Sequence, residues 1–322
     1  MATPSSIFTE LVTTTLRNHP AELADNMSNH NALWRRLSAK NRITTLDGGY
    51  EIVRPLEYAE NQTYQRFSGY DVLNVGASDV LTAVKFPWRQ AAVNVTASGE
   101  ELRKNSGRER IIPFVKSRIA VAMKTMANNL SQDLYSAGLL TNQIGGIRSI
   151  IQDNGQGSVG GIDSATWTFW RNKFREAAGT NTISKSTIKG EMNGLWLNLV
   201  RGTDKPDLIV ASIDFYSMYW ESLQDLQRYT GNDNDMAKAG FQSLKYVTAD
   251  VIHDTAVSGI TDEHMYMLNT DYLELCVHRD ANMTEGDEQR PINQDAVAVP
   301  VLWMGNLVCS NRALQGTLID AA

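Results

Sequence analysis

Apolar and polar residues alternate in two stretches of the first hundred residues, and this alternation is typical of β-strands. The first stretch covers residues 50–58 and the second covers residues 91–98. Turn signals at Ser68-Gly69 and Gly76 lie between them, and no helical period appears over 48–98. We therefore predict a long β ribbon. Because an isolated two-stranded ribbon is marginal in water, a neighbouring subunit would have to cover whatever its own domain leaves bare.

The predicted ribbon is rich in aromatic and basic side chains, which protein interfaces favour. The residues that we take as candidate inter-subunit contacts are Arg54, Tyr58, Tyr64, Arg66, Phe67, Tyr70, Lys85, Phe86, Trp88 and Arg89. The alternative is an ordinary β-sheet domain whose core these aromatic residues would fill, and composition alone favours it about as often.

The clearest helical pattern follows the ribbon, where apolar residues recur at steps of three and four. These residues are Ile111, Val115, Ile119, Met123, Met126, Leu130 and Leu134. Pro113 suits the first turn of a helix and Gly138 suits its C-terminal end. The pattern predicts a spine helix over 113–137, about 38 Å long at 1.5 Å per residue. Before the ribbon, a short amphipathic helix over 20–38 is expected within an arm of 47 residues.

The second half of the chain reads as a small α/β domain followed by strands. Helices are expected from Ser164 through Phe174, over 186–200 and over 213–229, with a buried strand at 208–210. Further strands are expected at residues 246–247, 251–252, 265–268, 272–277 and 296–304.

Composition narrows the classes of protein. The chain has 322 residues, a net charge of −6 and two cysteines, Cys276 and Cys309. This balance counts against a dedicated nucleic-acid binder, and the cysteine count counts against a disulfide or zinc scaffold. No secretory signal is visible, and the most apolar stretch, 296–309, is too short to span a bilayer. We expect a soluble cytosolic protein.

Two motifs could carry chemistry, and neither is persuasive. Gly155-Gln-Gly157-Ser-Val-Gly160 matches GxGxxG, but no strand runs directly into it and no helix opens within it, so we expect a flexible loop. Asp250, His253 and Asp254 are close in sequence but would not converge on one metal ion, so we interpret them as surface or turn residues. The mixed charges of 100–110 are most simply a solvated connection. No catalytic, cofactor-binding or metal-binding residue is expected.

The order of these parts resembles the major capsid proteins of tailed double-stranded-DNA bacteriophages, which have the HK-ninety-seven-like fold. The resemblance spans essentially the whole chain and becomes specific through segments that occur together and in order. These segments are ELADNMSNHNALWRRL (22–37), DGGYEIVRPLEYAENQTYQRFSGYD (47–71), FPWRQAAVNVTASG (86–99), TMANNLSQDLYSAG (125–138), NQIGGIRSII (142–151), TWTFWRNKF (166–174), PDLIVASIDFYSMYWESLQ (206–224) and WMGNLVCSNRALQGTL (303–318).

The resemblance implies an α+β fold with four parts. Residues 1–47 would form an N-terminal arm and 48–98 an extended β loop that lies over the neighbouring subunit. Residues 99–144 and 266–300 would form a peripheral domain with the spine helix, and 145–265 and 301–322 an α/β axial domain.

The function that the resemblance implies is self-assembly into the pentamers and hexamers of an icosahedral head around phage double-stranded DNA. The protein would be located in the virion after assembly in the host bacterial cytoplasm, without a cofactor or a membrane. Its partners would be other copies of itself, a portal, a decoration or cement protein, and DNA that it contacts only non-specifically. A separate scaffolding protein is expected because no scaffolding segment precedes the arm.

Some relatives cross-link Lys to Asn between subunits, but Lys85, the only lysine of the ribbon, is not at a convincing tip, so we expect no cross-link. Two other functions remain open. One is an encapsulin-like compartment shell, and the other is an α/β enzyme that uses His253 and Asp254 or the glycine loop at 155–161.

Overall fold

The computed structural model describes residues 31–104, 114–178, 182–224, 244–254 and 259–321. By internal contacts the chain divides into two compact units. The smaller unit includes Ala92–Asn128 and Met283–Leu302, and the larger unit comprises His30–Ala91, Asn129–Asn282 and Trp303–Ala322. Several long elements, such as α4 (Phe114–Asp133) and β4 (Arg89–Ser98), have residues in both units.

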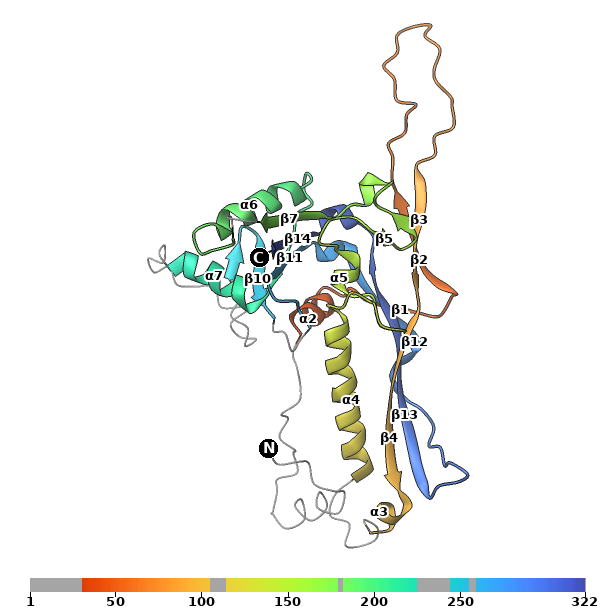
Figure 1. Cartoon of the computed structure of the whole chain (residues 1–322). Coiled ribbons are helices and arrows are strands. Elements are labelled where there is room, and N and C mark those ends of the chain that lie inside the picture. Colours follow the sequence, from red (N-terminus) through yellow and green to blue (C-terminus); the bar gives the residue numbers. More distant parts are fainter. Residues whose placement is uncertain (1–30, 105–113, 179–181, 225–243, 255–258, 322) are drawn as a thin grey trace. The chain divides into compact units, whose positions relative to one another are not determined.

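A six-stranded mixed sheet is the centre of the larger unit (Figure 1). In spatial order its strands are β7 (Lys173–Ala178), β14 (Gly316–Ala321), β11 (His264–Leu268), β8 (Leu208–Ala211), β10 (Ala249–His253) and β9 (Leu244–Tyr246). β8 pairs with β10 in parallel and with β11 antiparallel, and all four of its residues are buried. A continuous apolar run is what a central strand covered on both faces requires.

Helices α6 (Ile188–Leu199) and α7 (Ile213–Gln224) pack on this sheet, α6 against β7 and β14, and α7 against β8 and β10. In α6, Ile188, Met192, Leu195 and Leu199 are spaced by four, three and four residues, and all four are fully buried. Their spacing places them on one helical face, which joins the core of the sheet.

Of the two stretches predicted to form the ribbon, residues 50–58 contain β2 (Glu51–Glu57), whose antiparallel partner is β3 (Leu81–Pro87). The second stretch, residues 91–98, lies in β4 and is not part of this pair, so that half of the prediction is wrong. Ile52 lies opposite Phe86 in this pair, and both side chains are buried. They pack with Trp170 and Val308 into a second core, over the small hairpin of β5 (Ser158–Val159) and β6 (Ile162–Asp163). The alternation seen in the sequence therefore has one buried face at the root of the ribbon.

Two of the remaining strands, β12 (Leu273–Glu285) and β13 (Ala296–Cys309), are long, whereas β1 (Ile43–Leu46) has four residues. β1 pairs in parallel with β12. Short elements connect the sheets: α2 (Ala32–Ala39), α5 (Ile147–Ile150), and the 3-10 turns η2 (Thr168–Trp170), η5 (Thr270–Tyr272) and η6 (Arg312–Leu314). No helix in the described ranges has both the length and the apolar character to cross a bilayer.

In the smaller unit, α3 (Gly99–Lys104) and α4 are joined by polar contacts. Arg118 of α4 donates to the backbone oxygen of Thr96 at 2.8 Å and pairs with the buried carboxylate of Glu101 at 3.3 Å. The prediction that the charged stretch is a solvated connection is therefore wrong at Glu101. Residues 105–110 of that stretch lie outside the described residues. The spine helix is confirmed over 114–133, and Met126 and Leu130 of its apolar face are buried.

The helix expected from Ser164 through Phe174 is wrong. That segment contains the single turn η2 and then strand β7, in which Phe174 pairs with Thr317 of β14. The aromatic spacing imitated a helix, but Trp170 instead inserts into the second core and donates its ring N–H to the Val159 oxygen at 3.1 Å. Pairing with a strand that lies far along the chain is not visible in a local pattern.

The glycine motif is a tight turn and not the flexible loop that the sequence suggested. Gly155, Gly157 and Gly160 all have positive φ, and a Cβ atom at Gly160 would overlap Val84. The fully buried guanidinium of Arg312 fixes the surrounding segment. It donates to the backbone oxygens of Ile150, Gln156, Gly157 and Trp170 and to the Ser164 hydroxyl.

Candidate assembly interface

The loop that joins β2 and β3, residues 58–80, extends beyond the two strands (Figure 1) and contains several exposed large apolar residues. The side chain of Tyr64 is 81% exposed and that of Tyr70 is fully exposed. Its other exposed large apolar residues are Phe67, Val72, Leu73 and Val75. Burying a side chain of this size completely contributes about 1.5–3 kcal/mol of favourable free energy. Contact with another molecule would therefore be stabilised by burying these residues.

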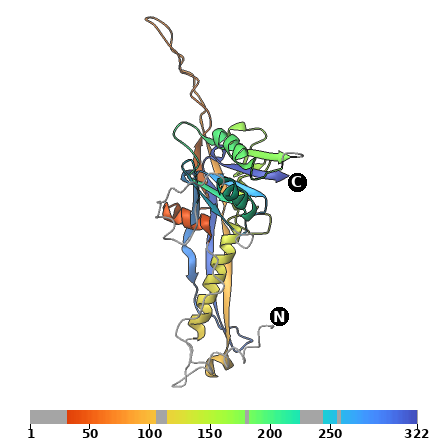
Figure 2. The same ribbon diagram turned by 90° about the vertical axis from the view of Figure 1, so that its left-hand side faces the viewer.

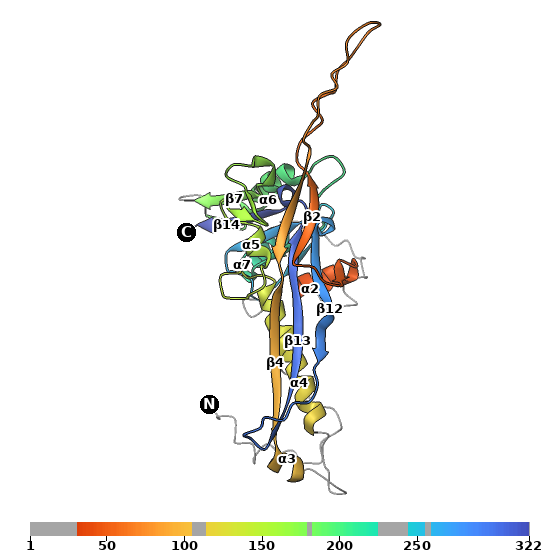
Figure 3. The ribbon, with the colours of Figure 1, turned by 90° about the vertical axis from the view of Figure 1, so that its right-hand side faces the viewer.

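Side chains hold the two limbs of the loop together in place of a backbone ladder. Gln65 donates to the Val72 oxygen at 2.9 Å and accepts from the Asn74 amide at 3.2 Å. Ser68 and Asp71 close the tip, where the Ser68 amide donates to the carboxylate of Asp71 at 2.8 Å. Figures 2 and 3 show the two limbs running close together in both side views. The loop is therefore shaped in advance, which lowers the entropy lost when a partner binds it.

The candidate contact residues fall into two groups. Tyr64, Arg66, Phe67 and Tyr70 lie on the exposed loop, and Tyr58 lies at its root. The others are Arg54, Lys85, Phe86, Trp88 and Arg89, which lie in or beside the strands.

Several residues of the second group support the subunit's own fold. Phe86 is buried in the second core, so it is not available to a neighbouring subunit. Arg54 pairs with Glu274 at 2.8 Å, and Trp88 donates its ring N–H to the Gly49 oxygen at 2.9 Å. Lys85 is exposed and lies 4.0 Å from Glu51, and Arg89 is half-buried at the start of β4.

Sequence reasoning missed two sets of exposed apolar residues. Val72, Leu73 and Val75 follow the tip of the loop, and Leu139 and Leu140 lie on the turn after α4. That turn is held by hydrogen bonds from Gln143 to Asp133 and from Ser136 to the Ile144 oxygen. The sequence does contain a signal for these residues. They are apolar, they lie between turn residues, and they lack the periodic spacing that would predict a place in a core.

Two observations describe the metal-binding and thiol chemistry of the described residues. These residues contain no group of three His, Cys, Asp or Glu side chains placed to hold a metal ion. Burial raises the pKa of Cys276 and of Cys309 to about 12, so both thiols are protonated at neutral pH and are poor nucleophiles.

Asp254 is buried and not a surface residue as the sequence suggested. It accepts from the Tyr135 hydroxyl at 2.9 Å and from the Ala32 amide at 3.4 Å, at the start of α2. Its neighbour Asp250 pairs with Arg36 of α2 at 3.2 Å. The carboxylates of this segment therefore hold the helix of the predicted arm.

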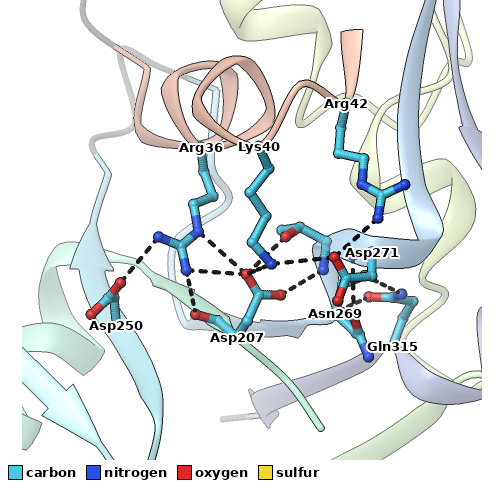
Figure 4. Close-up of polar contacts among 9 residues, drawn as sticks. Arg36, Lys40, Arg42, Asp207, Asp250, Asn269, Asp271 and Gln315 are labelled. Carbon is cyan, nitrogen blue, oxygen red and sulfur yellow. Dashed lines mark hydrogen bonds and ion pairs between the residues drawn. The ribbon is translucent and has the colours of Figure 1, made fainter. Parts of the chain in front are cut away.

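An ionic cluster, which we call the arm anchor, completes this attachment (Figure 4). From α2 and the turn after it, Arg36 reaches Asp207 at 3.2 Å, and Lys40 reaches the same carboxylate at 2.9 Å. Arg42 pairs with Asp271 at 3.1 Å. Burial raises the pKa of Asp207, but hydrogen bonds from Thr270 and the charge of Lys40 outweigh burial, so the net pKa is lowered and the group stays ionised.

The chain is similar over nearly its whole length to solved capsid proteins. The chain of the cyanophage A-1(L) capsid asymmetric unit has a TM-score of 0.65 and 14% identity, covering 97% of this chain and 99% of that chain. The capsid of an empty GTA particle has a TM-score of 0.59 and 9% identity, covering 94% and 95%. A chain of Mycobacterium phage Bobi has a TM-score of 0.58 and 10% identity, covering 99% and 100%.

This chain therefore has the fold of phage capsid proteins, as the resemblance in its sequence led us to expect. A scan against protein-family models finds no match, and neither does a search of the curated proteins. The resemblance is thus one of three-dimensional structure, at identities of 9–14% for the three proteins above.

Proposed function

We propose that the chain is the major capsid protein of a tailed bacteriophage, with the HK-ninety-seven-like fold. It would assemble into the pentamers and hexamers of an icosahedral head that encloses double-stranded DNA. The observation that carries this proposal is the full-length match to capsid chains, which leaves almost nothing over on either chain: 97% of this chain and 99% of the cyanophage capsid chain superpose.

The parts of the chain support this assignment. The ribbon and its loop lie within the proposed extended β loop, 48–98, and α4 lies within the peripheral segment 99–144. The six-stranded sheet with α6 and α7 supports an α/β axial domain over 145–265 and 301–322. The peripheral domain would also include 266–300. The arm would be 1–47, of which residues 31–47 are described and contain α2 and β1.

The physics of shell building fits these features. Subunits in a closed ring contact one another through two different patches, so each needs an element that reaches out and a surface that receives it. The loop 58–80 has the exposed apolar side chains of such an element. The chain's net charge of −6 suits a wall that contacts packaged DNA only non-specifically, because acidic surfaces repel a polyanion.

The same proposal places the protein in the virion after assembly in the host bacterial cytoplasm. A scaffolding protein, a portal and a decoration protein would be its partners. We assign no enzymatic activity. An encapsulin-like shell shares the assembly chemistry but encloses enzymes in place of DNA.

The test is the assembly state of the purified full-length chain, alone and with its scaffolding protein. Sedimentation velocity and negative-stain microscopy at low and high salt should show closed, regular particles. Particles that persist at high salt would point to apolar contacts, because salt screens ion pairs. A chain that stays monomeric or dimeric in every condition would overturn the proposal. DNA or enzymes recovered from native particles separates a phage head from a compartment.

A further inference from the structure

A groove of about 340 Å³ lies at the root of the loop, where the two limbs enter β2 and β3. Aromatic rings form one wall: the centroid of Tyr58 lies 5.7 Å from those of Trp167 and Phe169. Trp167 is 48% exposed, so part of its ring is open to solvent. Ala83 of β3 also lines the groove, and its side chain is small.

One carboxylate, that of Asp79, lines the same groove. Partial burial and then the negative charge of Asp79 raise the pKa of Tyr58, which indicates that the carboxylate lies close to the aromatic wall. No basic side chain lines the groove. Aromatic faces with one nearby carboxylate attract a cation, and arginine is the side chain found most often at such sites.

The loop itself carries a suitable cation. Arg66 is the only Lys or Arg between Glu57 and Leu81. It is exposed, lies in sequence between the exposed residues Tyr64 and Phe67, and forms no ion pair or hydrogen bond within the described part of the chain. The groove thus has a carboxylate but no basic side chain in its lining, and Arg66 of the loop has no acidic partner in the described part of the chain.

Arg66 cannot enter the groove of its own chain while the loop keeps its shape. The Tyr58 amide donates to the Val80 oxygen at 3.0 Å at the root, and the Gln62 amide meets Ser78 at 3.4 Å further out. The contacts of Gln65 with the opposite limb come later still. Arg66 follows Gln65, so all these links separate it from the groove, and the cation must come from another molecule.

We propose that this groove receives Arg66 from the loop of a second copy of the chain. The contact is heterologous, since the tip of one loop meets the root of the next, and repeating it joins subunits head to tail. Tyr64 and Phe67 flank the arginine and would bury their apolar surface around the groove. This inference rests on the proposed function, because it supplies one of the contacts by which the shell subunits recognise one another.

Thiol cross-linking tests which groove the tip occupies. Arg66→Cys and Ala83→Cys are combined in the full-length chain, whose own two cysteines are buried. Because an arginine side chain is longer than a disulfide allows, a short bis-maleimide is the probe. We expect a ladder of covalent multimers on denaturing gels, and each single variant should give none. A cross-link confined to one chain, or no ladder from assembled particles, would overturn the proposal.

Charge variants test the chemistry. Asp79→Asn and Arg66→Gln should each weaken association about tenfold, in line with a partly desolvated cation–π and ion pair. Glu60→Gln, which removes an acid from the same loop outside the groove, is the matched control and should assemble normally. The exchange Asp79→Arg with Arg66→Asp should assemble better than either single change. Melting temperatures confirm that each variant is folded.

The outcomes separate this inference from the proposed function. Particles from the wild type together with unaffected Asp79 and Arg66 variants would overturn the groove contact alone. Asp79→Asn particles that form normally but lose a bound decoration protein would assign the groove to that protein and overturn the second-copy occupant. A wild-type chain that forms no oligomer at all would overturn both.

Discussion

The strand pair β2–β3 and the loop that joins it belong to one hairpin, but their apolar side chains differ in burial. In the strands, Ile52 and Phe86 face a core made by the subunit itself. In the loop, Tyr64 is mostly exposed and Tyr70 fully exposed among the described residues. The strands therefore stabilise the subunit, while the loop is fitted for contact with another molecule. The sequence pattern alone does not distinguish the buried apolar residues of the strands from the exposed ones of the loop.

Removing the loop gives the largest expected effect. Residues 59–79 are replaced by a two-residue Asn-Gly turn, which leaves β2, β3 and their pairing in place. Assembly into particles should be lost, because the exposed apolar residues are gone, whereas the melting temperature should hardly change. Sedimentation velocity and circular dichroism measure the two quantities. Complete particles from this variant would show that the loop is not an assembly element.

A matched pair of aromatic truncations sharpens the comparison. Phe86→Ala should lower the free energy of unfolding by about 3–5 kcal/mol, because it leaves a cavity in the second core. Tyr70→Ala should change it by less than about 0.5 kcal/mol, because that side chain is fully exposed in the described part of the subunit. Urea denaturation of unassembled subunits measures both. Equal losses of stability would contradict the division between root and loop.

Glycine substitutions in the turn between β5 and β6 test how closely this hairpin packs against β3. Gly160→Ala should cost about 1–3 kcal/mol, since positive φ adds strain and the new methyl group would overlap Val84. Gly161→Ala is the control: its φ is also positive, but no atom lies within 4 Å of the added carbon, so it should cost only about 1 kcal/mol. If the Gly160 variant is as stable as the Gly161 variant, the hairpin β5–β6 can shift away from Val84 without loss of stability.

The sequence correctly predicted the elements whose buried residues form a regular local pattern. The alternation over 50–58 predicted β2, the three-and-four spacing predicted α4 and α6, and the apolar run at 208–210 predicted β8. In the helices and in β2 the core-facing side chains recur at a fixed period, and in β8 they form a continuous apolar run, so each pattern is visible within a short window of sequence.

Residues whose partners are single and distant could not be predicted. Arg312 fixes the turn around Gly157, and Asp207 binds Arg36, which is 171 positions away in sequence. Nothing in a local window marks such a pair, so the glycine turn looked flexible. The candidate contact residues show the same limit. Composition identified the aromatic residues of the ribbon, but their burial depends on distant partners, and only the structure shows that Phe86 is buried and Tyr70 is exposed.

The arm anchor gives the smallest effect and extends the comparison to a polar contact. The pKa of Asp207 is lowered in the folded chain, so its contribution to stability is present above the unfolded pKa and is lost as the pH falls through the folded pKa. Thermal melts from pH 6 downward should therefore show a loss of stability below about pH 4. Asp207→Asn should be less stable at pH 6 and should lose less on acidification. Asp280→Asn, an exposed acid on β12, is the control and should follow the wild type. If Asp207→Asn keeps the full pH dependence of the wild type, the anchor is not the group that titrates.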